Sequence, residues 1–431
     1  MRVLQALIDG GGNVAPQLAI TRRLIERGHH VTVLGHRTLR ARVEARGAEF
    51  VPFERTMPDI DFSDPEKDYV ADWGARTPIG AAARFRDRGL IAPLRDSAAE
   101  ALELLERQPA DVAVVDFLLP GVLTAAQRKG IPAFALVHCP YPGPVPGVPP
   151  LGTGLRPGRN PATHARDRVL NMVCDRFYRP LLAEVNAVRR EYGMPPLPSV
   201  RGMIGAADRV FALTVPELDF ASRGELQESV RFAGPAFEPT AGEWQSAWPA
   251  TNTDPLLLIS FSTTYMDQRG FAERVLAAVA PLRVRALLTT GPALDVSGLE
   301  VPANARVVPF APHSAVVPHA ALVVTHAGYG TVQTALAAGV PVVCMPDGRD
   351  QPDVAARVVE AGVGLRVGRS AKPERLRETI SRALADPALR EAAMRMAEAL
   401  RRRDGAATVV EEVERLGPTT SALAPSPAAA S

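Results

Sequence analysis

Residues 323–331, VVTHAGYGT, combine a histidine with a glycine-rich turn in an arrangement suited to binding an anion. A short apolar run leads to His326, Gly328 and Gly330 permit a tight turn, and Thr331 begins a predicted helix. The free N–H groups and the positive dipole end of a helix N-terminus attract anions, and a histidine can donate one further hydrogen bond. The pattern favours a diphosphate site; a turn that only requires glycine is the alternative.

A carboxylate and an amide stand side by side after the next apolar run, residues 340–346. Asp350 and Gln351 together offer hydrogen-bond acceptors and donors, which suit neighbouring hydroxyl groups of a sugar. Such a pair in isolation is typical of a solvated loop. Because this pair follows the predicted diphosphate segment by one strand, we interpret it as the sugar-binding part of a nucleotide-sugar site.

The elements that position these residues begin with a strand–helix–strand unit at the N-terminus. A predicted strand over 2–8 is followed by the glycine-rich stretch 10–13, a helix over 16–27 and a strand over 30–35. Such a unit predicts a parallel, doubly wound sheet. The first half is completed by predicted strands at 110–116, 131–138 and, as its last strand, 209–214, and by helices at 89–107, 120–129 and 162–193.

The second half of the chain repeats this alternation, so we expect an α/β protein of two Rossmann-like domains that face each other across a cleft. Ligands of open α/β sheets bind at the carboxyl ends of the strands. Predicted strands lie at 256–262, 284–291, 305–310, 321–326 and 340–346, and helices at 270–280, 331–339, 372–385 and 387–416. We assign 1–235 to the first domain, 236–254 to a linker, 255–400 to the second domain, 401–416 to a helix that packs back on the first domain, and 417–431 to a disordered tail.

The overall composition excludes several functional classes. A net charge of +2 over 431 residues lacks the electrostatic signature of a nucleic-acid-binding protein. Cys139, Cys174 and Cys344 are too far apart in the sequence to indicate a metal cluster, and they predict reduced thiols. The N-terminus has no apolar run long enough for a signal peptide, and no stretch predicts a membrane span, so we expect a cytoplasmic protein.

Residues 306–365, together with RFAGP at 232–236 and TTG at 289–291, resemble the family 1 glycosyltransferases of the GT-B fold. The similarity is greatest to actinobacterial enzymes that modify antibiotics and other natural products. The resemblance implies an inverting transfer of a hexose or deoxyhexose from a UDP- or dTDP-sugar. It further implies a small lipophilic acceptor such as a polyketide, macrolide or phenol, bound by the first domain between the segments 57–85 and 140–160. No cofactor or metal is expected, and the protein is expected to be a monomer or homodimer.

The resemblance also implies roles for individual donor-site residues. Phe310 opens the segment whose aromatic residue stacks on the nucleobase, and His313 ends that segment. Ser262 and Thr263 lie in a turn that touches phosphate, where serine 262 replaces the family's glycine. The other implied contacts are those of His326, Gly328, Gly330 and Thr331 to the diphosphate, and of Asp350 and Gln351 to the sugar hydroxyls.

The sequence departs from the family at the position of the general base. The loop after the first strand usually carries a histidine, but here Asn13 stands in its place, and an amide does not accept a proton near neutral pH. Asp116, which matches the aspartate that orients that histidine, is the first candidate for a substitute base, acting directly or through water. Asp9 and His138 adjoin strands near the same cleft and are weaker candidates.

Three explanations of this departure stay open: an acidic acceptor that needs little help, formation of a C–C or C–N bond, or an inactive partner protein of the same fold. A further alternative is an NADP-dependent oxidoreductase, because Gly10, Gly12 and Ala15 fit a dinucleotide fingerprint. The second strand ends at Gly35 without a carboxylate, so only a phosphorylated cofactor suits that alternative. The triplet DID at 59–61 resembles a metal-binding D-x-D but follows no strand.

Overall fold

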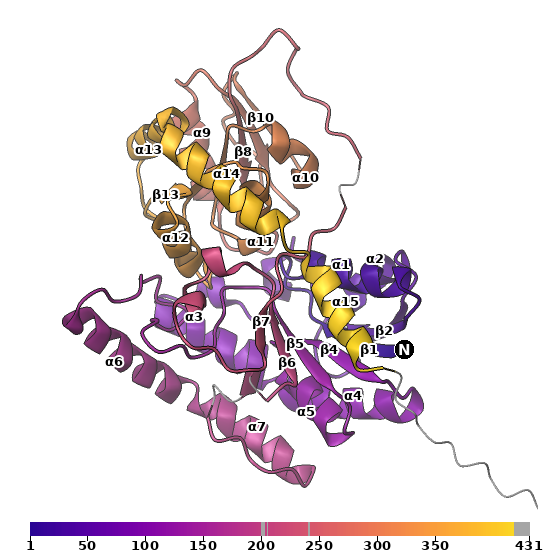
Figure 1. Ribbon diagram of the computed structural model, residues 1–431. Coiled ribbons are helices and arrows are strands. Elements are labelled where there is room, and N and C mark those ends of the chain that lie inside the picture. The colour runs from indigo at the N-terminus through magenta and orange to yellow at the C-terminus, as the bar shows by residue number, and fades with distance from the viewer. Residues whose placement is uncertain (200–202, 205, 240–241, 418–431) are drawn as a thin grey trace, which may run out of the picture.

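The computed structural model describes residues 1–199, 203–204, 206–239 and 242–417 (Figure 1). Its strands form two separate parallel sheets, of seven and of six strands, and each belongs to its own α/β domain. The prediction of two parallel α/β domains is confirmed. Residues 240–241 of the expected linker and 418–431 of the expected tail lie outside the described residues. Within the described part of the chain, no helix combines the length and the apolar character needed to cross a membrane.

The first sheet has the strand order β3-β2-β1-β4-β5-β6-β7. The chain therefore runs outward in one direction from β1 to β3 and in the other from β4 to β7, which opens a crevice at the carboxyl ends of β1 and β4. The inner strands Val112–Asp116 and Ala133–Val137 are buried on both faces, as expected for a sheet covered by helices on both sides. The strands of this sheet are β1 (Arg2–Leu7), β2 (His30–Gly35), β3 (Glu49–Pro52), β4 (Val112–Asp116), β5 (Ala133–Val137), β6 (Arg209–Ala212) and β7 (Val230–Phe232).

The helices of the first domain differ from the predictions in two of the expected helices and in two short helices, Arg40–Glu44 and Pro78–Arg84, that were not expected. The helix expected over 162–193 is divided into two, because Pro180 has no N–H to continue the first helix and lies in the first turn of a second helix that begins at Arg179. The helix expected from 89 begins only at Leu94, after a π-helical turn over Phe85–Ile91. The helices are α1 (Val14–Glu26), α2 (Arg40–Glu44), α3 (Pro78–Arg84), α4 (Leu94–Arg107), α5 (Pro120–Arg128), α6 (Pro161–Phe177) and α7 (Arg179–Glu191).

The second sheet has the order β10-β9-β8-β11-β12-β13, so its crevice opens where β8 and β11 end. The segment that follows β12, expected to be a loop, already begins helix α12 at Gln351. The strands are β8 (Leu256–Ser260), β9 (Arg285–Thr289), β10 (Ala305–Val308), β11 (Leu322–Thr325), β12 (Val342–Cys344) and β13 (Gly364–Arg366). The helices are α9 (Arg269–Val279), α10 (His313–Val316), α11 (Tyr329–Ala337), α12 (Gln351–Glu360), α13 (Pro373–Ala385), α14 (Pro387–Arg401) and α15 (Gly405–Arg415).

The C-terminal helices lie on different domains (Figure 1). The single helix expected over 387–416 is interrupted, and Asp404 caps α15 by accepting a hydrogen bond from the amide of Ala407. Helix α14 packs on the second domain, whereas α15 buries Val409 and Val413 in the core of the first. The carboxylate of Glu414 pairs with Arg27 of α1 at 2.6 Å. The chain therefore returns to the first domain.

The two places where the chain passes between the domains touch each other. The amide of Gly405 donates to the carbonyl of Pro235 at 2.9 Å. A Cβ on Gly405 would lie 2.2 Å from the carbonyl oxygen of Gly234, and Gly234 itself has a φ of +96°. Both positions need glycine, because the two backbones meet here without room for a side chain.

Candidate active site

His326 directly follows β11 and is buried at the start of the turn before α11. Burial lowers its pKa to about 4, so the imidazole is neutral at pH 7. Among the described residues, its Nδ1 has no hydrogen-bond partner. A Cβ on Gly328 would lie 2.7 Å from the Nε2 atom of His326, which explains the glycine. A buried nitrogen without a partner, beside a helix N-terminus, suits an anionic ligand.

The turn after β8 lies beside this nitrogen at the same edge of the sheet. Gln268 accepts a hydrogen bond from the amide of Ser262 at 2.7 Å, and the hydroxyl groups of Ser262 and Thr264 are 3.0 Å apart. Thr263 is exposed. Thr331 lies in the first turn of α11, after the exposed Gly330. The strands β8 and β11 are neighbours, so both turns present their polar groups to one place.

Phe310 follows β10 and is 79% exposed, although it is a large apolar side chain. Its neighbour His313 is held in place, with its Nε2 3.0 Å from the hydroxyl of Thr289. Burial lowers the pKa of His313, which keeps that imidazole neutral. An exposed aromatic ring on a fixed turn is a surface on which a planar base can stack.

Asp350 and Gln351 begin α12 at the carboxyl end of β12. The Oε1 of Gln351 accepts hydrogen bonds from the amides of Asp347 at 2.9 Å and Gly348 at 3.2 Å, which leaves its amide nitrogen as a donor. Asp350 stands at the N-cap position without making a side-chain cap. Burial raises the pKa of Asp350, and the charges of His138 and Arg349 act in the opposite direction. The pair thus offers one carboxylate and one amide to a ligand.

On the first domain, Asp116 ends β4 and its side chain is 0% exposed. Its Oδ2 accepts from Nδ2 of Asn13 at 2.9 Å and from Nε2 of Gln17 at 2.6 Å. Its Oδ1 accepts from the amide of Leu118 at 3.0 Å and lies 3.2 Å from Nε2 of His138. Burial alone raises the pKa of Asp116, but the charge of His138 and these hydrogen bonds outweigh it and hold the pKa below its usual value.

The glycine-rich loop of the first domain lies against the two polar turns of the second. A Cβ on Gly11, which has a φ of +77°, would lie 3.2 Å from Cβ of Thr263 and 3.1 Å from Cγ2 of Thr264. The carbonyl oxygen of Gly12 would lie 3.9 Å from a Cβ on Gly330. The predicted donor residues and the loop that carries Asn13 therefore face each other across the boundary between the domains.

Arg349, which our sequence analysis did not single out, joins the same region. Its guanidinium donates two hydrogen bonds to Asp72 of the first domain, both at 2.8 Å, and one to the hydroxyl of Thr264 at 3.0 Å. Beside this contact, the rings of Trp73 and Tyr265 meet edge to face at 4.7 Å. The segment 57–85 is therefore fastened to the second domain. The backbone of Arg349 has a positive φ of 54°, a conformation that an arginine in the sequence does not predict.

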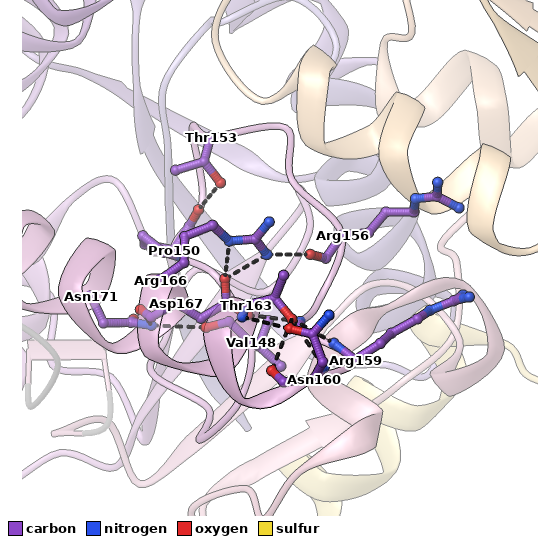
Figure 2. Close-up of polar contacts among 11 residues, drawn as sticks. Val148, Pro150, Thr153, Arg156, Arg159, Asn160, Thr163, Arg166, Asp167 and Asn171 are labelled. Carbon is purple, nitrogen blue, oxygen red and sulfur yellow. Dashed lines mark hydrogen bonds and ion pairs between the residues drawn. The ribbon is translucent and has the colours of Figure 1, made fainter.

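The segment 140–160 is fastened to α12 and to α6. The carboxylate of Asp353 accepts from the amides of Gly152 at 2.8 Å and Gly154 at 3.1 Å. Figure 2 shows the attachment to α6, where the side chains of Asn160 and Thr163 form a reciprocal cap. The segment expected to line an acceptor site is thus attached to the helix that begins at Asp350 and Gln351.

A buried ion pair holds α12 against the first domain. Arg357 donates to Asp219 at 3.0 Å, and the two side chains are 5% and 0% exposed. Asp219 also accepts from the amides of Tyr141 and Ala221. Close by, the hydroxyl of Tyr329 donates to that of Thr214 at 2.6 Å. The boundary between the domains is therefore polar at this point, where Asp219 and Arg357 also line a cavity of about 150 Å³.

Comparisons with known proteins agree with this architecture. Residues 273–416 match the family described as Erythromycin biosynthesis protein CIII-like, C-terminal domain. The 4'-demethylrebeccamycin synthase of Lentzea aerocolonigenes is 31% identical over 422 residues, which cover 96% of this chain and 99% of that protein. The O-mycaminosyltylonolide 6-deoxyallosyltransferase of Streptomyces fradiae is 28% identical and covers 96% of this chain and 97% of its own length.

Solved structures of glycosyltransferases share the fold over almost the whole chain. The glycosyltransferase of kitacinnamycin superimposes with a TM-score of 0.74 at 24% identity, covering 96% of this chain and 98% of its own. The calicheamicin glycosyltransferase CalG4 gives a TM-score of 0.72 at 23% identity, covering 97% and 99%. The chain therefore belongs to the family 1 glycosyltransferases of the GT-B fold, is itself a glycosyltransferase, and is related to the natural-product glycosyltransferases of actinobacteria.

Proposed function

We propose that this enzyme transfers a hexose or deoxyhexose from a UDP- or dTDP-sugar to a small lipophilic natural product, with inversion at the anomeric carbon. The observation that carries the proposal is the juxtaposition of the two domains. A Cβ on Gly11 would touch Thr263, and one on Gly330 would lie 3.9 Å from the carbonyl oxygen of Gly12, so the turns of the second domain lie close to the loop of the first. A sugar bound at Asp350 and Gln351 would therefore have its anomeric carbon at the boundary, where an acceptor on the first domain can reach it.

The donor would be held by the carboxyl edge of the second sheet. Phe310 would stack on the base, and Asp350 and Gln351 would bind the sugar hydroxyls. The negative charge that builds on the departing diphosphate would be stabilised by the N-terminus of α11 and by the neutral imidazole of His326. The hydroxyl groups of Ser262 and Thr263 add further donors. We propose that these groups, without a metal ion, supply the stabilisation that leaving-group departure requires.

The acceptor would lie on the first domain, between the segments 57–85 and 140–160. Both segments are attached to the second domain, through Asp72 and through Gly152 and Gly154. A closed site of this kind keeps water from the donor and limits its hydrolysis. The relatives that act on antibiotic intermediates support a polyketide, macrolide or phenol as the acceptor class.

The proposal is tested by incubating the protein with UDP- and dTDP-glucose and a panel of phenol, macrolide and polyketide aglycones. We expect a mass gain of one hexose on at least one acceptor, and a β-linked product from the α-linked donor by NMR. A protein that binds neither nucleotide sugar in calorimetry would contradict the proposal. A retained α linkage would contradict inversion while leaving the transfer itself intact.

Removing the exposed ring of Phe310 should weaken nucleotide binding. Stacking of a base on an aromatic side chain contributes about 1–3 kcal/mol by alanine substitution, which corresponds to a loss of about fivefold to 150-fold in affinity. We therefore expect UDP or dTDP to bind Phe310→Ala more weakly by such a factor in calorimetry, whereas Phe310→Trp retains the affinity. Because Phe310 is 79% exposed, the stability of the fold should change little. Equal affinities for the alanine variant and the wild type would place the base elsewhere.

A further inference from the structure

We infer that His138 accepts the proton of the acceptor in this enzyme and that Asp116 positions it. The inference rests on the proposed function. It assigns to His138 the role that the family's histidine, replaced here by Asn13, would have. His138 lies one residue beyond β5, and Asp116 ends the neighbouring parallel strand β4. Their side chains meet with Nε2 of His138 3.2 Å from Oδ1 of Asp116.

The hydrogen bond determines which ring nitrogen is free to act. A carboxylate only accepts, so Nε2 of His138 carries the hydrogen and Nδ1 keeps its lone pair. The other oxygen of Asp116 is occupied by the amides of Asn13 and Gln17. Because Asp116 is fully buried with two donors on each oxygen, it has no atom free to touch an acceptor. Its position is suited to orienting the imidazole and stabilising the imidazolium.

The histidine also lies on the side of the first domain that faces the sugar-binding pair. Its side chain is 12% exposed, so a small part of it reaches the protein surface. The chain that leaves His138 runs to Gly152 and Gly154, whose amides hold Asp353 on the first turn of α12. The charge of Asp350, at the start of that helix, acts on His138 from the second domain. An acceptor between His138 and a sugar on Asp350 would touch both.

The step balances without any further reactant. The acceptor heteroatom forms a bond to the anomeric carbon while the bond from that carbon to the diphosphate oxygen breaks. The electron pair of the broken bond leaves with the nucleoside diphosphate, and the proton of the acceptor passes to Nδ1 of His138. Release of that proton to solvent returns the enzyme to its starting state.

The pH dependence follows from the groups around the ring. Burial lowers the pKa of His138, but the charges of Asp116 and Asp350, the hydrogen bond of Asp116 and a backbone hydrogen bond at His138 outweigh it, so the pKa is raised above its usual value. A base works only when it is neutral, so kcat/KM should fall as the pH drops below that raised pKa. Phe117 packs on the ring at 5.2 Å and carries no charge, and Tyr69, which also senses Asp116, has a pKa raised to about 12 by burial and stays neutral.

The test compares His138→Gln, Asp116→Asn and a control, His36→Asn, on an alcohol acceptor and on an acidic phenol. Loss of a general base typically costs about 10²–10⁴-fold. We expect the transfer rate of His138→Gln to fall by about that factor with the alcohol and by far less with the phenol. The decrease of kcat/KM at low pH, which is the acid limb of the pH profile, should also disappear in this variant. Asp116→Asn should shift that limb to lower pH. Nδ1 of His36 accepts a hydrogen bond from the amide of Asp9 at 2.8 Å, and the side-chain oxygen of an asparagine can accept the same bond. The pH profile of His36→Asn should therefore match that of the wild type.

The results of this experiment distinguish a failure of the His138 assignment from a failure of the proposed function. UDP affinity within twofold of the wild type shows that each variant is folded. If wild-type protein transfers sugar and His138→Gln keeps its rate on the alcohol and its acid limb, only the assignment of His138 is overturned. If wild-type protein transfers sugar to no acceptor, the proposed function fails and the inference fails with it. Partial recovery of the alcohol rate on adding Asn13→His to His138→Gln would support the inference, because a histidine there lies beside Asp116.

Discussion

Replacement of Asp350 by alanine is expected to reduce sugar transfer by about 10²–10⁴-fold while leaving UDP binding within twofold of the wild type. A hydrogen bond to a charged group contributes about 1.5–3 kcal/mol, and one carboxylate can accept from two adjacent sugar hydroxyls, so about 3–6 kcal/mol is lost. UDP lacks the transferred sugar, so its binding does not depend on this carboxylate. Single-turnover rates with the nucleotide sugar and calorimetry with UDP measure the two effects separately.

The matched control for this change is Asp347→Asn, three residues earlier in the same segment. The carboxylate of Asp347 pairs with the exposed side chain of Arg369 at 2.9 Å. We expect this variant to transfer sugar within about twofold of the wild type, because a single exposed partner contributes little. Equal losses in both variants would mean that the segment, and not the carboxylate of Asp350, is what transfer requires.

Replacement of Arg357 by alanine is expected to destabilise the protein by about 3–5 kcal/mol, since breaking a buried ion pair leaves an uncompensated buried charge. The charge left behind is that of Asp219, which is fully buried. Urea unfolding followed by tryptophan fluorescence measures the loss. Trp73 meets Tyr265 across the domain boundary, so it reports on separation of the domains as well as on unfolding.

Arg223 provides a control that differs mainly in burial. Both Arg223 and Arg357 lie over the ring of Phe220, at 5.2 and 4.4 Å from its centre, and both pair with a carboxylate. The side chain of Arg223 is 46% exposed, and exposed ion pairs contribute about 0–1 kcal/mol. Arg223→Ala should therefore lower the urea midpoint only slightly. A loss as large as that of Arg357→Ala would show that packing on Phe220, and not the buried charge, stabilises this region.

The long apolar strands of this fold could be predicted from the sequence, because strands buried on both faces are continuous runs of Val, Leu and Ala. Such runs identified β1, β4 and β11 and, with them, the positions of Asp116 and His326. The strands β3, β7 and β13, of three or four residues each, were missed. All three are edge strands in which charged residues or glycine interrupt the apolar run, so the sequence shows no continuous apolar segment there. Each is defined by pairing with the strand that precedes it in the chain.

Contacts within one sheet were easier to foresee than contacts between the domains. Asn13 and Asp116 are 103 residues apart, yet each follows a strand, and the pairing of β1 with β4 brings them to 2.9 Å. Arg349 and Asp72 are 277 residues apart and meet only because of how the domains are oriented. No local pattern encodes that orientation. His138 was a weaker candidate than Asp116 because its alignment with that carboxylate depends on the same β4–β5 register that only the structure gives.

The contact of Gly234 with Gly405 has a consequence for how the domains can move. Both covalent connections between the domains leave the first domain at this point, so a rotation of the domains about it would stretch neither connection. Displacement in such a rotation would grow with distance from the point. A small rotation would then separate Arg349 from Asp72 more than it disturbs Pro235 and Gly405. The site could then open for substrate entry by a rotation of the domains about this pair of glycines, without stretching the chain.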